Sequence, residues 1–162
     1  MKKLRQGLLC GAITGAMLLA VAAVGTGCTE KNKDATPIKV LESYIETSFN
    51  VKGLEDKAKM SELLTGDTKR RLDSWSDEQF LRAFVETKRK YESLKILENK
   101  KVSDQETALT YELTFQEGEG DKKAKISQRK LCVVVQTDSA WRIKEVRSIR
   151  ESIEYLKEFS LP

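Results

Sequence analysis

The sequence predicts an α+β fold, with N-terminal helices packed on one face of an antiparallel sheet of about four strands and a short helix at the C-terminus. Apolar residues recur at helical spacing from Thr36 to about Lys90, and the period changes to two after Lys90. An order of helices followed by strands is typical of an α+β domain. We therefore expect one domain over residues 36–162.

The first 27 residues are typical of an export signal rather than of a folded domain. Three cations stand within the first five positions, and residues 6–29 carry no charge. The apolar stretch 8–24 has 17 residues, fewer than the ~20 that a membrane-spanning helix needs. We expect this leader to be cleaved.

Gly25-Thr26-Gly27 immediately before Cys28 resembles the end of a bacterial lipoprotein signal peptide. The resemblance implies that Cys28 becomes the first mature residue, with a diacylglyceryl thioether on its sulfur and, in many bacteria, a further acyl chain such as palmitate on its amino group. Residues 28–35 would then be a polar tether. Cleavage after Ala22, giving a soluble secreted protein, and an uncleaved N-terminal anchor remain as alternatives.

The lipoprotein resemblance implies a location in the cell envelope. In enteric bacteria an aspartate after the lipidated cysteine favours the inner membrane, and Thr29 stands there. The expectation is therefore the outer membrane, facing the periplasm, if the host is Gram-negative. The chain has 29 basic and 25 acidic residues, and the surplus is largely in the leader, so charge gives no argument for nucleic acid as a partner.

The helical region divides into four predicted segments. Thr36-Pro37 offers a cap and an N-terminal proline for the first helix, and Gly53 separates it from the second. The second spans 54–64 and ends at Thr65-Gly66. Asp67 is expected to cap the third helix, and Ser76 with Gln79 forms a capping box for the fourth.

The strand region follows a meander. Strands are expected at 91–97, 107–115, 125–136 and 141–149. Asn99–Glu106 is expected to form a turn, and Glu117–Lys123 a hairpin loop. A bulge near Glu145 is needed to place Ile143 and Val146 on one face. The final segment, Ser152–Phe159, is expected to be helical.

This order of elements, with a tryptophan opening WRIKEVRSI and the segment LLTGDTKRRL in the helical part, resembles small lipoproteins of the nuclear transport factor two-like superfamily. The resemblance covers roughly residues 36–150. It implies a cone in which a curved sheet wraps the first helix and leaves an opening at the wide end. Members of that superfamily include enzymes, small-molecule binders and interaction modules, so the resemblance does not choose a function.

Histidine and cysteine counts exclude several chemistries. The chain has no histidine, which excludes His-based triads and the usual zinc sites. Cys10 belongs to the leader and Cys28 is the lipid candidate, so Cys132 is alone in the domain and is expected to be a buried, inert thiol. We expect no metal, no cofactor and no catalytic residue. Asp67, Asp73, Asp77 and Glu112 are interpreted as capping or surface residues.

The candidate binding residues are aromatic. An apolar ligand pocket would be lined by Tyr44, Trp75, Phe84, Tyr111, Phe115 and Trp141. The same residues can also be ordinary core. Basic clusters form a separate candidate surface, in which Arg129 would lie near Arg142 or Lys144, with Glu112 and Glu145 balancing the charge.

These observations favour a membrane-anchored, non-enzymatic module of the cell envelope that acts by binding, with an envelope protein as its expected partner. A carrier or sensor of a small apolar ligand is the alternative, and a proton-transfer enzyme with a carboxylate beside Tyr111 is a third. A homodimer through the sheet face is also open.

Overall fold

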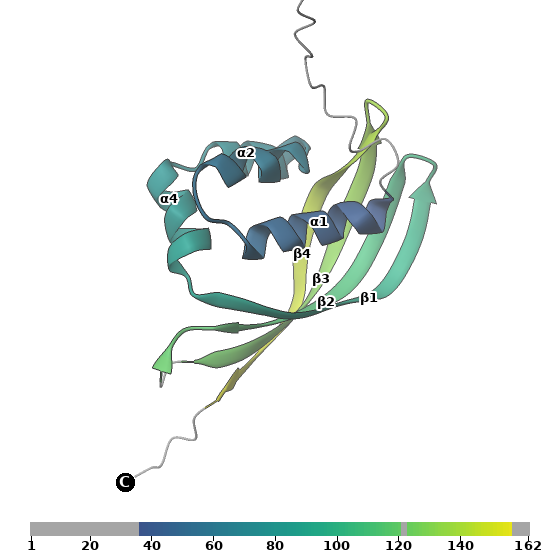
Figure 1. The fold of residues 1–162 in the computed structure, drawn as a ribbon. Helices are drawn as coiled ribbons and strands as arrows, with labels where there is room; N and C mark the ends of the chain where they lie inside the picture. The colour runs from purple at the N-terminus through teal and green to yellow at the C-terminus, as the bar shows by residue number, and fades with distance from the viewer. Residues whose placement is uncertain (1–35, 121–122, 157–162) are drawn as a thin grey trace, which may run out of the picture.

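The computed structural model describes residues 36–120 and 123–156. Across these residues the chain forms four α-helices, one π-helical turn and four strands, which confirms the α+β class (Figure 1). The elements are α1 (Pro37–Phe49), α2 (Glu55–Glu62), α3 (Gly66–Asp73), α4 (Asp77–Leu81), η2 (Arg82–Glu86), β1 (Arg89–Ser103), β2 (Glu106–Glu117), β3 (Ala124–Thr137) and β4 (Ala140–Tyr155).

The four strands form one curved, open sheet in the order β1-β2-β3-β4, and every neighbouring pair is antiparallel. Helix α1 runs across one face of this sheet, and α2, α3 and α4 gather at one end of it (Figure 1). We call the face that α1 covers the inner face and the opposite one the outer face. β1 and β4 are the two edges of the sheet.

Two predicted helix starts are confirmed. The Thr36 hydroxyl accepts from the Lys39 amide at 3.3 Å, and Pro37 is the first residue of α1. At α4 the Ser76 hydroxyl accepts from the Gln79 amide, and the Gln79 side chain accepts from the Ser76 amide, as a capping box requires. These local bonds satisfy amides that the first turn of a helix leaves free.

The predicted cap of α3 is wrong by two residues. Thr65, not Asp67, occupies the cap position, and Asp67 lies in the first turn, where it pairs with Arg70. The displacement follows from a tertiary contact, because the Thr65 amide donates to the Ile143 carbonyl at 2.9 Å and the Ile143 amide donates to the Leu63 carbonyl at 2.8 Å. These bonds fasten the segment between α2 and α3 to β4.

The first strand is longer than its apolar residues predict. The expected turn at Asn99–Glu106 is wrong, because β1 continues to Ser103 and only two residues separate it from β2. Asn99, for example, pairs with Leu109 of β2. The end of β1 is an exposed sheet edge, where polar side chains are compatible with a strand. The polar residues of this segment therefore indicated a solvent-exposed strand and not a turn.

The predicted C-terminal helix is also wrong over the part that the structure describes. β4 continues to Tyr155, and Ile153 pairs with Ile126 of β3. Pairing with β3 satisfies the backbone of this segment and overrides its weak helical spacing. Residues 157–159 of the predicted helix lie outside the described residues. The bulge is confirmed, since Val133 pairs with Glu145 and Val134 with Ile143, leaving Lys144 as the extra residue.

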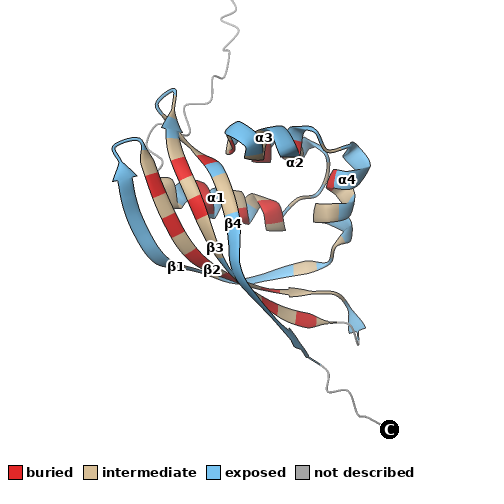
Figure 2. Ribbon diagram, turned by 180° about the vertical axis from the view of Figure 1, so that it is seen from behind, coloured by how far each residue is buried: buried red, intermediate tan, exposed pale blue. Residues whose placement is uncertain are grey.

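The core lies between α1 and the inner faces of β2 and β3. Buried residues alternate along β2, as expected for a strand with one face covered, whereas β1 is mostly exposed (Figure 2). The fully buried apolar residues include Val40, Leu41, Met60, Phe80, Leu109, Cys132, Val134 and Ile143.

Among the described helices none is long and apolar enough to cross a membrane. The leader, Cys28 and the tether lie outside the described residues.

Candidate functional site

The inner face of β3 changes chemistry along its length. Ile126, Gln128, Lys130, Cys132 and Val134 occupy successive inner positions, opposite Phe115, Leu113, Tyr111, Leu109 and Thr107 of β2. Cys132 and Val134 are fully buried under α1. Gln128 and Lys130 are only half-buried, so the covered face carries an amide and an amine where an apolar core would carry methyl groups.

A hollow of about 380 Å³ opens at these polar positions. This volume is within the range of small-molecule sites. Its walls come from the end of α1, from α3 and η2, and from the inner faces of β2 and β3. We call it the inner pocket, and its lining includes Tyr44, Ser48, Phe49, Arg71, Trp75, Phe84, Arg89, Tyr111, Leu113, Phe115, Glu117, Gln128 and Lys130.

Five of the six predicted pocket residues line the inner pocket, and the sixth does not. Tyr44, Trp75, Phe84, Tyr111 and Phe115 meet there. Trp141 does not line it and packs instead against the apolar core, opposite Gln136 at the start of β4. The prediction placed Trp141 with the others from its aromatic character alone, whereas its position along β4 puts it at the other end of the sheet.

Arg89 is the principal charge at the pocket. Its guanidinium lies over the Phe49 ring at 5.1 Å and over the Phe84 ring at 5.3 Å from the centroids. Nη2 reaches the Ser48 carbonyl at 3.4 Å, and the buried Nε has no hydrogen-bond acceptor among the described residues. Burial lowers the pKa of Arg89, and nearby Glu117 opposes that effect. The aromatic rings hold the cation in place but leave a donor unused.

Lys130 supplies a second cation on the same face. It stands opposite Tyr111 in the β2–β3 ladder. Burial lowers the pKa of the Lys130 ammonium, Glu151 raises it, and Arg89 lowers it further. Glu151 accepts a hydrogen bond from Gln128 at 2.5 Å. The pKa shift shows that the covered setting disfavours the charged amine, which a bound anion would relieve.

The two tyrosines of the pocket are protonated at neutral pH. Burial raises the pKa of Tyr44 and of Tyr111. At Tyr111, nearby Cys132 and Tyr44 raise the pKa further. Burial also raises the pKa of Cys132 to about 12. Cys132 is fully buried, as predicted, and its thiol is not in the thiolate form that reacts.

The described carboxylates are not buried beside the pocket tyrosines. Among the described residues Asp56 is the one buried acid, and it closes the turn before α2 by accepting from the Lys52 amide at 2.9 Å and from Lys59 Nζ at 2.6 Å. Asp73 accepts from Ser61 and Lys69. Glu117 reaches the pocket lining and is half-buried. No described acid is buried beside Tyr111, where proton abstraction would need one.

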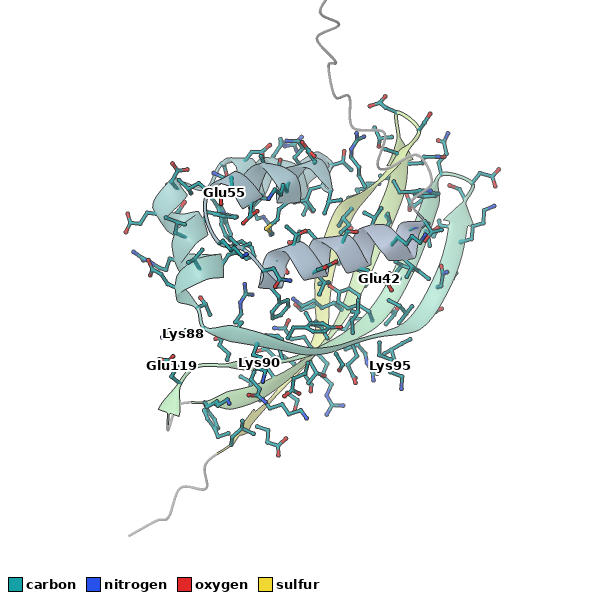
Figure 3. All side chains as sticks on the ribbon, viewed as in Figure 1. Glu42, Glu55, Lys88, Lys90, Lys95 and Glu119 are labelled. Carbon is teal, nitrogen blue, oxygen red and sulfur yellow. The ribbon has the colours of Figure 1, made fainter. Side chains whose placement is uncertain are left out.

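A second, larger groove of about 690 Å³ lies between α1 and β1. Glu42 and Glu46 line it from α1, and Lys90 and Tyr91 from β1. Arg89, Ile45 and Phe49 line both hollows, so Arg89 stands between them. Figure 3 shows Glu42 on α1 and Lys95 on the side of β1 away from α1.

The basic residues of the outer face pair differently from the prediction. Arg129 lies opposite Arg150, not Arg142 or Lys144. Glu112 does balance Arg129, with an oxygen 3.4 Å from its guanidinium. Glu145 pairs with Arg147 at 2.6 Å. The tight turn after Thr137 already places Arg129 opposite residue 148, and the two register shifts of this ladder move its partner to Arg150, so the predicted neighbours lie too close to the turn.

Sequence reasoning missed the polar part of the inner pocket, namely Arg89, Gln128 and Lys130. A signal was present, because Ile126, Cys132 and Val134 fix which positions of β3 face inward. Gln128 and Lys130 continue the same alternation. Polar residues at inward positions indicate a solvated or ligand-binding cavity.

No protein-family model matches the chain, and a search of curated proteins finds no significant match. Within the described residues no group of three or more acidic or cysteine side chains could hold a metal ion. The inner pocket is therefore the feature that bears on function.

Proposed function

We propose that this protein is an extracytoplasmic lipoprotein, tethered through Cys28, that binds a small ligand with an apolar body and an anionic group in the inner pocket. The observation that carries the proposal is the pair of covered cations, Arg89 and Lys130, beside the aromatic wall of the pocket. In this proposal the curved sheet and α1 form the cone of nuclear transport factor two-like domains.

The ligand chemistry follows from the energetics of the lining. Trp75, Phe84 and Phe115 offer apolar surface that favours a hydrocarbon or aromatic ligand. A cation removed from water is unfavourable unless it is paired. Arg89 keeps an unused Nε donor, and burial disfavours the charged form of Lys130. An anionic group on the ligand would satisfy both cations, and hydrogen bonds to charged groups contribute about 1.5–3 kcal/mol each.

We infer binding rather than catalysis from the state of the polar groups. The tyrosine hydroxyls have raised pKa values, so they do not act as bases at neutral pH. The acid that a proton-transfer enzyme needs beside Tyr111 is absent among the described residues. The carboxylate among the described pocket-lining residues is Glu117, which lies opposite Arg89 rather than beside Tyr111. The pocket thus offers charge and shape for recognition.

Tryptophan fluorescence tests the ligand class directly. Trp75 lines the inner pocket and Trp141 does not, so in the Trp141→Phe variant the emission reports the pocket. We expect decanoate to change this emission saturably and decylamine, with the same chain and a positive charge, to have no effect. Decanol should bind more weakly than decanoate, because it lacks the anion that pairs with Arg89 and Lys130.

Variants separate the cations of the pocket from general surface charge. Lys130→Met and Arg89→Met should each weaken decanoate binding by about tenfold, the equivalent of one charge-assisted hydrogen bond. Lys95→Met is the matched control, since Lys95 is exposed on the outer face, and it should bind as the wild type does. Equal binding of decanoate and decylamine would overturn the anionic assignment. Binding unaffected by both pocket variants would overturn the site.

The tether is tested separately. Intact mass of the mature protein should show Cys28 as the first residue with acyl chains attached, and Cys28→Ser should release the protein from the membrane fraction. A mature chain that begins at another, unmodified residue would contradict lipidation and leave the pocket proposal untouched.

A protein of the cell envelope is the second candidate partner. The edge strand β1 favours it, because Leu97 and Val102 are 39% and 56% exposed on an unpaired sheet edge. Native mass spectrometry of protein extracted from its own host distinguishes the two. A ligand-sized added mass supports the inner pocket, and a co-purified protein released by Val102→Glu supports the edge.

A further inference from the structure

The last third of β4 is an exposed sheet edge with apolar side chains. Over this part β4 has a neighbouring strand on one side only, and Ile149 and Ile153 are 57% and 50% exposed. Natural proteins usually protect such an edge with prolines, covering loops or inward-pointing charges, because it otherwise templates pairing with another strand. Within the described residues no element covers this edge (Figure 2).

The backbone of this segment has donors and acceptors directed away from the sheet. The Leu156 amide donates to the Lys123 carbonyl at 3.0 Å, so Leu156 points its backbone groups toward β3. In an antiparallel ladder the direction alternates from residue to residue. The amide and carbonyl groups of Glu151 and Ile153 therefore point outward, ready to bond another strand.

Among the described residues, Arg150 on the outer face of this segment has no acidic partner. Arg150 lies directly opposite Arg129, and the one acid near them, Glu112, pairs with Arg129. Like charges in opposed positions destabilise a sheet. Glu154 lies opposite Lys125, whose ammonium pairs with Glu92 at 3.5 Å. Neither Arg150 nor Glu154 itself forms an ion pair among residues 36–120 and 123–156.

We propose that β4 pairs antiparallel with β4 of a second copy of this chain, around a two-fold axis at Ser152. Residues whose numbers are symmetric about 152 then face each other. Arg150 of each copy comes opposite Glu154 of the other, on the same outer face. Each unbalanced arginine thereby gains an acid, and the two sheets become one continuous sheet.

The charge pattern selects this register over its neighbours. Pairing centred one residue earlier, at Glu151, would place the two Glu151 side chains opposite each other. Pairing centred one residue later, at Ile153, would place Arg150 opposite Leu156 and Glu154 opposite Ser152. Only the register centred at Ser152 joins Arg150 and Glu154, and it keeps inner faces on one side, because opposed residues lie an even number of positions apart.

A second copy fits this edge because the strand is complementary to itself. A two-fold interface requires that each contact be repeated with the roles exchanged. The segment Arg150-Glu151-Ser152-Ile153-Glu154 meets that requirement through its terminal charges. The edge is distinct from the sheet face that the sequence suggested for a homodimer, and the proposal does not depend on the ligand of the inner pocket.

Cysteine cross-linking in membranes of cells that express the full chain tests the register. Ser152 points its backbone toward β3, so Ser152 and its copy form a non-hydrogen-bonded pair with Cα atoms ~4.5 Å apart, within disulfide range. Ser152→Cys should give a disulfide-linked dimer on mild oxidation. Ser148→Cys is the matched control on the same strand, and its two copies would lie more than ~20 Å apart at ~3.3 Å per residue.

Charge reversal provides an independent measurement on the detergent-extracted protein. Arg150→Glu and Glu154→Arg should each raise the dimer dissociation constant at least tenfold by analytical ultracentrifugation, and the double variant should restore it. Arg150→Glu also places an acid opposite Arg129, so loss of the dimer would not follow from a weakened monomer.

A Ser152→Cys dimer without a Ser148→Cys dimer, above the wild-type background of the native cysteines, supports the proposal. Equal cross-linking of both variants, no cross-linking of either, or a Ser152→Cys product with the mass of a different protein overturns it. Failure of the double variant to restore the dimer overturns the Arg150–Glu154 pairing.

Discussion

The two halves of the inner face share strands and alternation but differ in chemistry. Under the middle of α1, Leu109 and Cys132 lie opposite each other and are fully buried. A few residues along the same strands, Tyr111 faces Lys130 and Leu113 faces Gln128. The first half is a packed core, and the second half opens into a hollow of about 380 Å³.

This difference shows that a covered sheet face is not core throughout. Packing against α1 satisfies the apolar half by removing it from water. The other half lies at the C-terminal end of α1, where Phe49, the last residue of the helix, and Phe84 of η2 hold Arg89 over the strands. We conclude that the site arises where the sheet is longer than the helix that covers it.

The largest expected effect comes from a matched pair of truncations on β2. Leu109→Ala should lower the free energy of unfolding by about 2–5 kcal/mol, because it leaves a cavity in a close-packed region. Leu113→Ala removes the same atoms beside an existing hollow and should cost about 2 kcal/mol or less. Urea unfolding measures both, and equal losses would contradict the distinction between core and pocket.

The next effect concerns the covered amine. Lys130→Met should leave the melting temperature at pH 7 unchanged or higher, because a disfavoured charge is replaced by an apolar chain. The folded pKa of Lys130 lies below its ordinary value of 10.5, so the unfolded state holds its proton to higher pH. The free energy of unfolding of the wild type should therefore increase relative to that of the variant as the pH rises from 7 toward 10.5. Thermal unfolding at a series of pH values checks this, and a large loss at pH 7 would make Lys130 structural.

A smaller effect is expected at the turn that fastens the helical cover. The Lys52 amide and the Lys59 ammonium hold the pKa of Asp56 below its ordinary value of 3.8. Its contribution to stability is full above that value and is lost as the pH falls through the lower folded pKa. Asp56→Asn should melt at a lower temperature than the wild type at pH 7, and the difference should shrink as the pH falls below 3.8. If the difference in melting temperature stays constant from pH 7 to pH 2, the ionised Asp56 carboxylate is not the source of the stabilisation. Glu119→Gln, at an exposed ion pair, serves as the control.

The smallest effect is expected on the outer face. Glu112→Gln removes the acid beside Arg129, where both side chains are well exposed. Surface ion pairs contribute about 0–1 kcal/mol, so the change in unfolding free energy should stay below about 1 kcal/mol and vanish in high salt. A larger loss would mean that the outer face, and not only the inner one, sets stability.

Sequence reasoning predicted well where local chemistry decides. Thr36, Pro37 and the Ser76–Gln79 box gave helix starts, and the strand expected at 107–115 lies within β2. It failed at Asn99–Glu106 and at Ser152–Tyr155, where pairing with a neighbouring strand overrides composition. Of the six aromatic residues named for a possible pocket, five line one hollow and Trp141 does not, because spacing along one strand does not give distance across a sheet.

By itself the sequence determined the class of fold, the capped helices and the buried state of Cys132, because element order, capping residues and an apolar run can each be read from short segments. The tertiary structure alone decided that Arg89, at the first residue of β1, comes to lie between Phe49 and Phe84 beside Lys130 of β3. Strand register and the finite length of α1 bring these residues together, and neither is a property of any short segment. The same register leaves Arg150 opposite Arg129 at an edge that no described element covers, where we propose that Glu154 of a second copy pairs with it.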